Sequence, residues 1–284
     1  MPYTYHETLT HFTNFLTAYI HTLLYLRTLY PPTSFTTSRF HNTPVHQSRH
    51  PAVCEWITDA TTAVRDELLL GTVARIGIVI YNNSSNEATG SPKIMERYMF
   101  DVSKFPVIAK GDRNTELVWE DEKLTKEDKD KDKDKDQGKG RQKQKQKPSA
   151  LDAGVEVNLS EQFRAALLAL TTRCAKLSPL PKACSFNISM ELKDDPEMDP
   201  PIRHPQPWVP AQPSLQKTGR RRGTGGGDEK GEGEGEGEDL GGVKVTPLRV
   251  VEAGTFRFET WIEEGKAKFE VEGKAKSSFA SEGA

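Results

Sequence analysis

Three histidines and a cysteine lie close together early in the chain, and residues of these types can bind a metal ion. His41, His46 and His50 precede Cys54, and imidazole and thiolate groups are ligands that zinc prefers. Their spacing matches no recognised zinc-binding pattern. We therefore interpret them as separate polar side chains and expect neither a metal nor another cofactor.

Two repetitive runs imitate other kinds of binding site. The Gly–Glu repeat at residues 231–238 resembles a glycine-rich phosphate loop, but no strand precedes it, no helix pattern follows it, and its glutamates would repel phosphate. The Lys–Asp repeat at residues 128–136 has carboxylates, but its lysines neutralise them and no EF-hand pattern is present. The sequence also contains no Walker loop, GxSxG or HExxH motif. We therefore predict that the chain is not an enzyme.

The positive signal for function is an aromatic residue near the end of the chain. Residues 244–253 and 255–262 flank Gly254, which predicts a hairpin. Alternation along the second strand divides its side chains between a core face and an opposite face: Phe256, Phe258, Thr260 and Ile262 on the former, and Thr255, Arg257, Glu259 and Trp261 on the latter. The polar neighbours of Trp261 predict that it faces solvent as an anchor for a partner. The alternative is that its ring folds over its own sheet.

Two other tryptophans allow two interpretations each. Trp56 lies on the apolar face of a predicted helix, which favours core packing. Trp208 lies among prolines, where it could plug a loop or form the wall of a peptide-binding groove. Both therefore stay candidates for packing and for binding.

Composition divides the chain into a packed part and charged insertions. The 284 residues carry a formal net charge of −2, which is not the basic field of a typical nucleic-acid-binding protein. Residues 120–150 and 214–242 contain too few apolar side chains to offset the entropy of ordering. We therefore expect one domain over residues 1–264, interrupted by these two disordered insertions and followed by a disordered tail at 265–284.

The insertions contain basic clusters at Arg141–Lys147 and Arg220–Arg222. Such clusters are typical of solubilising loops; nuclear-import signals and weak contact with DNA are the alternatives. We expect no direct nucleic-acid partner.

The first apolar segment includes Asn14 and Arg27 and is too polar to span a membrane. The three cysteines form no CxxC pair, which favours a reducing compartment.

Hydrophobic periodicity predicts three helices and a small sheet. The helices are predicted at Leu9–Tyr30, where Pro31 stops the first, at residues 51–70, closed by Gly71, and at residues 159–177. Strands are predicted at Val73–Tyr81, Ile94–Val102 and Cys184–Leu192. Residues 33–49 are predicted to be a loop with at most a short strand. With the late hairpin, these elements make an α+β domain.

Four motifs resemble one family when they are taken in order: LLYLRTLYP at residues 23–31, PVHQSRHP at 44–51, PWVPA at 207–211 and PLRVVEAGTFRFETWIEEGKAK at 247–268. Together they resemble the HORMA domain family. Within it they are most similar to the non-catalytic accessory subunits of translesion DNA polymerase zeta, of the spindle-checkpoint-like Mad-two-B type. The resemblance covers most of residues 6–119 and 155–266.

The resemblance implies a fold and a binding mechanism. A HORMA domain packs three helices on an antiparallel sheet, and its C-terminal safety belt wraps over a partner peptide that joins the sheet as a strand. Transferred to this sequence, the belt covers about residues 200–262. Trp56 and Trp208 would line the channel for a proline-containing segment of the polymerase zeta catalytic subunit. The resemblance thus implies an adaptor.

The resemblance also implies further partners. Val245, Glu259 and Trp261 match the belt positions that bind the C-terminal domain of a second translesion polymerase, the deoxycytidyl-transferase scaffold; relatives carry an amide and a tyrosine at the last two positions. Arg164 matches an arginine used in dimerisation between HORMA domains. The expected function is a nuclear adaptor that joins the two polymerases in DNA damage tolerance. The alternative is a HORMA adaptor of the mitotic checkpoint or the meiotic chromosome axis.

Overall fold

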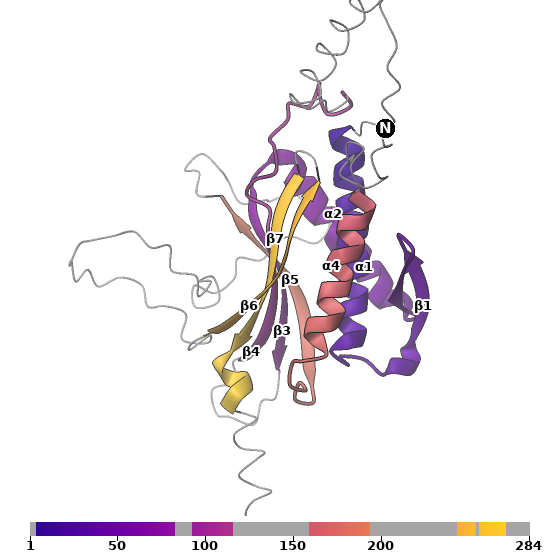
Figure 1. The fold of residues 1–284 in the computed structure, drawn as a ribbon, viewed down its shortest axis with the longest axis vertical. Helices are drawn as coiled ribbons and strands as arrows, with labels where there is room; N and C mark the ends of the chain where they lie inside the picture. Colours follow the sequence, from indigo (N-terminus) through magenta and orange to yellow (C-terminus); the bar gives the residue numbers. More distant parts are fainter. Residues whose placement is uncertain (1–3, 83–92, 116–158, 194–242, 254–255, 271–284) are drawn as a thin grey trace, which may run out of the picture.

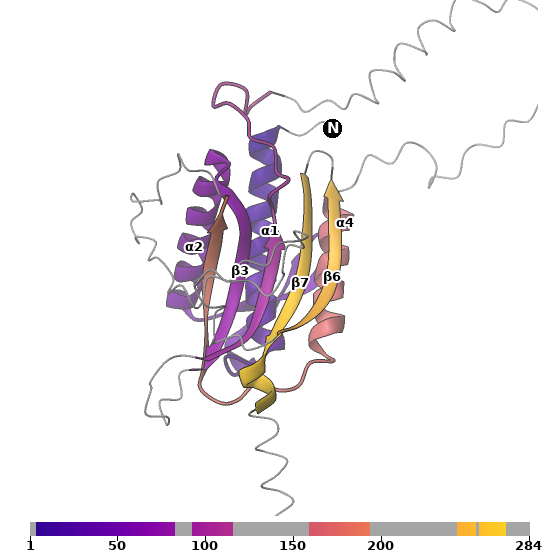
Figure 2. The same ribbon diagram turned by 90° about the vertical axis from the view of Figure 1, so that its left-hand side faces the viewer.

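The computed structural model describes residues 4–82, 93–115, 159–193, 243–253 and 256–270. They form three layers: a five-stranded antiparallel sheet, a layer of helices on one of its faces, and a two-stranded hairpin on the far side of the helices (Figure 1, Figure 2). This arrangement confirms the predicted α+β class.

Helix α1 (Tyr5–Leu26) runs along the middle of the helical layer, between α2 and α4 (Figure 2). Thr4 caps its start, because its side chain accepts the N–H of Glu7 while the Glu7 carboxylate accepts the N–H of Thr4 at 3.0 Å. This reciprocal pair satisfies two donors that the helix leaves unpaired. The helix therefore begins earlier than the predicted Leu9.

The end of α1 also differs from the prediction, which extended the helix to Tyr30. Thr28 adopts a left-handed conformation with φ of 51°. Its N–H donates to the carbonyl of Tyr25, and the N–H of Leu29 donates to that of Leu24. This Schellman arrangement ends a helix before any proline is reached. A β-branched residue rarely takes that conformation, so the sequence pattern pointed to the prolines instead.

Residues 33–49, predicted to be mainly loop, contain a complete hairpin. Strand β1 (Phe35–Phe40) pairs with β2 (Thr43–Ser48) after the short 3-10 turn Pro32–Ser34. The two connecting residues, His41 and Asn42, have φ of 45° and 59°, as a type I′ hairpin turn requires. Few of its side chains are apolar because most of the hairpin faces solvent, and this hid the strands from a hydrophobicity-based prediction.

The other two predicted helices are confirmed. Helix α2 (Pro51–Leu70) has Pro at its first position and ends at Gly71, which has φ of 78°. These are the positions where a helix tolerates proline and favours glycine. Helix α4 (Leu159–Cys174) packs beside α1.

The sheet has the strand order β5–β3–β4–β7–β6, with every neighbouring pair antiparallel. Its strands are β3 (Val73–Asn82), β4 (Lys93–Asp101), β5 (Cys184–Leu192), β6 (Val243–Ala253) and β7 (Phe256–Gly265). The late hairpin of β6 and β7 is confirmed, and β7 joins the sheet beside β4. Strands β5 and β6, joined by residues 193–242, are thus the two opposite edges of one sheet.

Aromatic side chains from α1, α4 and β7 meet in the core. The rings of Phe15 on α1 and Phe163 on α4 stack at 4.5 Å between centroids. Phe258 of β7 lies 5.2 Å edge-on from Phe12 and within 6.4 Å of Phe163. These side chains are almost completely buried, so the core fixes the C-terminal hairpin to the helices.

The packed structure continues past the expected boundary at residue 264, because residues 266–270 form a helical turn after β7. The predicted insertions, Trp208 and the basic clusters Arg141–Lys147 and Arg220–Arg222 lie outside the described residues. In the part of the chain that the structure describes, no helix is long and apolar enough to cross a membrane.

Candidate functional site

Strand β5 forms one edge of the sheet and pairs with β3 on one side. Among the described residues no strand pairs with its other side. The strand runs for nine residues without proline. The side-chain oxygen of Asn187 accepts the N–H of Ile188 at 2.8 Å, which indicates that this N–H faces the open side. The edge therefore offers backbone groups to an added strand.

An aromatic pair stands at this edge. Trp56 of α2 meets Phe186 of β5 edge-to-face, with 5.1 Å between ring centroids and an interplanar angle of 85°. Both side chains pack against the core but are only partly buried. Trp56 therefore fits both of its interpretations, since one side of the ring packs inward and the rest is accessible. Phe186 is a further candidate wall residue, which was not singled out from the sequence.

The opposite edge carries the residues expected to bind a second partner. Val245 on β6 pairs with Glu263 of β7 and is 48% exposed. Its strand is irregular, because the register shifts between Pro247 and Arg249. The cross-strand register places Val245, Glu259 and Trp261 on the same outer face of the hairpin, which is the face turned away from the helices.

Trp261 lies on the predicted face, but the prediction that it is exposed is wrong. It retains only 5% of its exposed area. Its Nε1–H donates to Glu263 Oε1 at 2.8 Å, and its cross-strand partner on β4 is the buried Met99. Its burial and its bond to Glu263 agree with the alternative interpretation. The prediction rested on Thr255, Arg257 and Glu259 and did not consider Glu263, the next residue on this face, which is itself buried and accepts the indole N–H.

The charge of Glu259 is balanced locally. Its carboxylate lies 3.7 Å from the guanidinium of Arg257 and 3.9 Å from the ammonium of Lys104. Both pairs are partly exposed, so each contributes little to stability. Of the three residues expected on this surface, Val245 and Glu259 are the accessible ones.

Arg164 lies on the exposed face of α4, the helix that packs against β6. It pairs with Glu161 one turn earlier at 3.5 Å, and its side chain is 45% exposed. Leu168, one turn later on this face, is 49% exposed. Charged and apolar side chains together make this helix face a possible contact surface.

The histidines and Cys54 are held in separate contacts. His46 stacks on Tyr25 with 3.5 Å between ring centroids, and His41 Nδ1 lies 2.9 Å from Ser160 Oγ. His50 precedes α2, and Cys54 Sγ donates to the carbonyl of Ser48. Burial lowers the pKa of both His41 and His46. Within the described ranges, no group of His, Cys, Asp or Glu is arranged to hold a metal ion.

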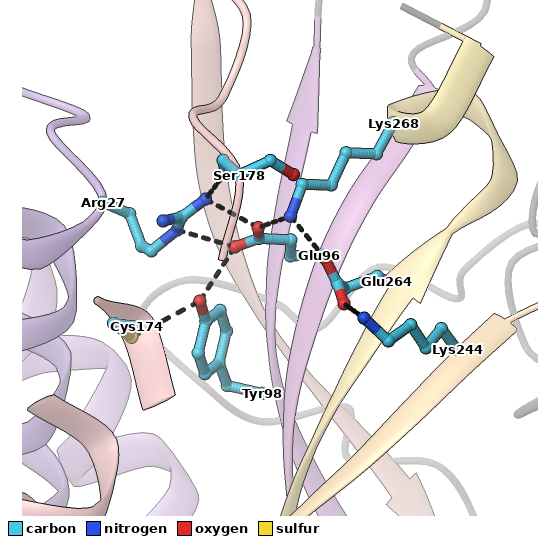
Figure 3. Close-up of polar contacts among 8 residues, drawn as sticks. All are labelled: Arg27, Glu96, Tyr98, Cys174, Ser178, Lys244, Glu264 and Lys268. Carbon is cyan, nitrogen blue, oxygen red and sulfur yellow. Dashed lines mark hydrogen bonds and ion pairs between the residues drawn. The ribbon is translucent and has the colours of Figure 1, made fainter. Parts of the chain in front are cut away.

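A buried cluster of charges, which the sequence reasoning missed, joins the C-terminal hairpin to the rest of the domain (Figure 3). The Glu96 carboxylate on β4 accepts bonds from Arg27 Nε and Nη2 at 2.9 and 2.8 Å, from the Tyr98 hydroxyl at 2.8 Å and from Lys268 Nζ at 2.6 Å. Lys268 Nζ also donates to Glu264 Oε1 at 2.6 Å. The signal in the sequence is a glutamate that alternates with Ile94 and Tyr98 on a core face.

This cluster shifts the pKa of its members. Burial disfavours the charge of Arg27, but Glu96 outweighs it and raises the pKa of the guanidinium. Burial, and then the charge of Glu96, raises the pKa of Tyr98 well above its ordinary value. Burial also opposes ionisation of Glu264, yet Lys268 and Lys244 together lower the pKa of this carboxyl. The buried part of the cluster sets two basic side chains, Arg27 and Lys268, against the carboxylates of Glu96 and Glu264, while Lys244 reaches Glu264 from the exposed margin.

Comparisons with known proteins agree with this architecture. The sequence profile of the HORMA domain matches residues 9–216. The DNA polymerase zeta processivity subunit of Schizosaccharomyces pombe is 38% identical over 97 residues, which are 34% of this chain and 42% of that protein. The mitotic spindle assembly checkpoint protein MAD2B is 30% identical over 95 residues in Danio rerio and 26% identical over 95 residues in Homo sapiens, each match again covering 34% of this chain and 42% of the relative.

The matches thus span 42% of the length of these curated relatives. Among solved structures, a chain of the crystal structure of the mitotic checkpoint complex aligns over 91% of this chain and 98% of its own length, with a TM-score of 0.53 and 13% identity. At that identity the likeness concerns the fold alone. Because the family profile covers most of the chain and the sheet and helices agree with it, the chain belongs to the HORMA domain family.

Proposed function

We propose that this HORMA domain is a non-catalytic adaptor that captures a short extended segment of a partner protein on the open side of β5. The observation that carries the proposal is an unpaired strand edge beside an accessible aromatic pair. The nine residues of β5 have no strand on their outer side among the described residues, and the half-buried side chains of Trp56 and Phe186 lie next to them. Backbone pairing would supply affinity, and the aromatic pair would supply selectivity.

Strand β5 ends at one edge of the sheet and β6 begins at the other. In the proposal, residues 200–262 form the safety belt, which leads from one edge to the other and encloses the bound segment. Enclosure slows release, since the ligand leaves only after the belt opens. Trp208 would belong to the inner side of this belt.

We further propose that the captured segment is a proline-containing part of the catalytic subunit of DNA polymerase zeta. The relative named as the processivity subunit of that polymerase supports this choice. A proline ring packs well on an accessible aromatic face, such as that of Trp56. The chain would then act in the nucleus, in translesion synthesis.

The outer face of the β6–β7 hairpin is the proposed site for a second partner, the C-terminal domain of the deoxycytidyl-transferase polymerase. Val245 and Glu259 would make the contact, and the buried Trp261 between them in the sheet would hold strand β7 in place. Arg164 and Leu168 on α4 would contact a second HORMA domain. The adaptor would thereby bring two polymerases together.

A second candidate is an adaptor in mitotic checkpoint signalling or on the meiotic chromosome axis. The relatives named as mitotic spindle assembly checkpoint protein MAD2B support it. The same edge of β5 would be used, but the preferred peptide would come from a checkpoint or axis protein.

Calorimetry with synthetic peptides tests the proposal. The full chain should bind the proline-containing segment of the polymerase catalytic subunit without added metal or nucleotide, and more tightly than peptides from checkpoint or axis proteins. Trp56→Ala should weaken binding by about 30-fold, as loss of an aromatic anchor does. The matched control, Leu70→Ala, removes a 61% exposed side chain from the far end of the same helix and should leave affinity unchanged. If Trp56→Ala binds the peptide as tightly as the wild-type chain does, the edge of β5 is not the binding site.

A further inference from the structure

Two buried glutamates face each other across the junction between β4 and β7. Glu96 and Glu264 are direct cross-strand partners, and their side chains are 0% and 2% exposed. Like charges directly opposite each other destabilise a strand pair, and burial strengthens the repulsion. By themselves, these carboxylates would drive the C-terminal hairpin away from β4.

Lys268 removes this repulsion. Its side chain is 1% exposed, and its ammonium lies 2.6 Å from Glu96 Oε1 and 2.6 Å from Glu264 Oε1 (Figure 3). The lysine comes from the helical turn that follows β7, so it reaches the junction only when that turn is folded against the sheet. Lys268 is thus a cation that bridges both carboxylates of this cross-strand pair, and the chain beyond β7 supplies it.

The cluster also divides into two parts that are each close to neutral. On the body of the domain, Glu96 keeps both bonds from Arg27 and the bond from Tyr98. On the hairpin side, Lys268 keeps Glu264 four residues earlier, and Lys244 of β6 lies 3.3 Å from the same carboxylate. Separation would break the Lys268–Glu96 pair and the neighbouring Arg97–Glu263 contact at 4.0 Å, but Glu96 and Glu264 would each keep a cation, so neither would become a buried unpaired charge, which is very costly.

We propose that Lys268 is a releasable clasp that sets whether the β6–β7 hairpin is docked on β4. The inference rests on the proposed function, because a hairpin at the end of the safety belt controls how long a captured segment stays enclosed. Loss of the Lys268 charge makes local opening of the hairpin more frequent, although its core side chains such as Phe258 still favour docking, and it leaves the helices and β3 in place. The clasp thereby regulates release of the ligand from β5.

Hydrogen exchange of the ligand-free full chain tests the clasp. Lys268→Met should accelerate exchange of the β7 amides at least about tenfold relative to those of β3, because local opening no longer breaks the ion pair. Lys266→Met is the matched control on the same turn, since Lys266 is 61% exposed and pairs only with Glu270 among the described contacts; it should change nothing. The double variant Lys268→Met/Glu264→Gln removes the repulsion and should return β7 exchange to within about threefold of the wild type.

Equal acceleration in β3 and β7, or unchanged exchange in β7, would overturn the clasp. So would a double variant that opens as readily as Lys268→Met, or that stays unfolded where the single variant does not fold. Once a peptide ligand is found, Lys268→Met should also speed its dissociation. The fold-increase in the dissociation rate should be at least as large as the fold-increase in β7 exchange. If no peptide binds the wild-type chain, the proposed function fails, while the exchange result still decides the clasp.

Discussion

The two edges of the sheet are built differently, although both belong to one continuous set of five strands. Strand β5 is regular, lacks proline and is flanked by a half-buried aromatic pair. Strand β6 contains Pro247 next to a register shift, and Arg249 bonds across to Gln162 of α4 at 3.1 Å. Helix α4 also lies behind β6 (Figure 2).

Natural sheets protect an edge with prolines, bulges and charges when an added strand is unwanted. The β6 edge has all three features, and the described part of the β5 edge lacks the first. The comparison teaches that this domain is asymmetric in what it can accept: backbone pairing at β5, and side-chain contacts on the face of the β6–β7 hairpin. The β6–β7 hairpin joins the rest of the sheet through the pairing of β7 with β4.

The largest expected difference in stability is between the loss of a carboxylate at the β4–β7 junction and the loss of one at the β5 edge. Glu96→Ala leaves Arg27 buried without its bidentate partner and should lower the free energy of unfolding by about 3–5 kcal/mol. Glu191→Ala on β5 removes a pair with Arg75 in which both side chains are 29% exposed, so it should cost about 0–1 kcal/mol. Urea denaturation measures both, and similar losses would contradict the contrast between a buried fastening and an open edge.

An intermediate effect is expected at the open edge itself. An added strand has to displace the Asn187 side chain from the N–H of Ile188. Asn187→Ala should therefore raise peptide affinity by about two- to tenfold, the worth of one net hydrogen bond. Thr246→Ala on the opposite edge strand is the comparison variant and should leave the affinity as it is. Weaker binding by Asn187→Ala would mean that this side chain helps to hold the ligand.

The smallest effect is a difference in pH dependence between the two sides. Lysines lower the pKa of Glu264 against the effect of burial, so its contribution to stability is present above about pH 4.3 and is lost as the pH falls through its lower folded value. Burial raises the pKa of Glu191 despite Arg75, so its contribution is present below about pH 4.3 and is lost as the pH rises through the raised value.

Acidification should therefore loosen the β7 side while the β5 side tightens. Hydrogen exchange between pH 3 and pH 6, corrected for the intrinsic rate, measures both sides in one experiment. Glu264→Gln should flatten the response of β7, and Glu191→Gln that of β5. A parallel response of both strands in the wild type would show that these two carboxyls do not control it.

Elements with strong periodicity could be predicted from the sequence. Helix α2 has a proline at its start and a glycine at its end, and β5 alternates cleanly, so both were located almost to the residue. The β1–β2 hairpin was missed because its turn uses His41 and Asn42 in left-handed conformations, and its outer side chains are polar. Local patterns report burial, and this hairpin is largely exposed.

The candidate site could be predicted only where one element carries it. Trp56 was found from its helix, but its contact with Phe186 depends on how α2 meets β5. The exposure of Trp261 was mispredicted because alternation along one strand says nothing of what covers that face, and both Trp261 and Glu263 are buried there. The cluster of Arg27, Glu96 and Lys268 unites residues that are far apart in sequence, so no spacing rule reveals it.

Hydrogen exchange of the full chain, with and without the proline-containing peptide of the polymerase catalytic subunit, tests the central claim most directly. A strand added at the open edge should protect the amides of Cys184–Leu192 by at least about tenfold, since their outward groups become paired. The amides of β6 should change much less. Protection confined to β6, with β5 unchanged, would contradict the assignment of β5 as the edge that captures the ligand.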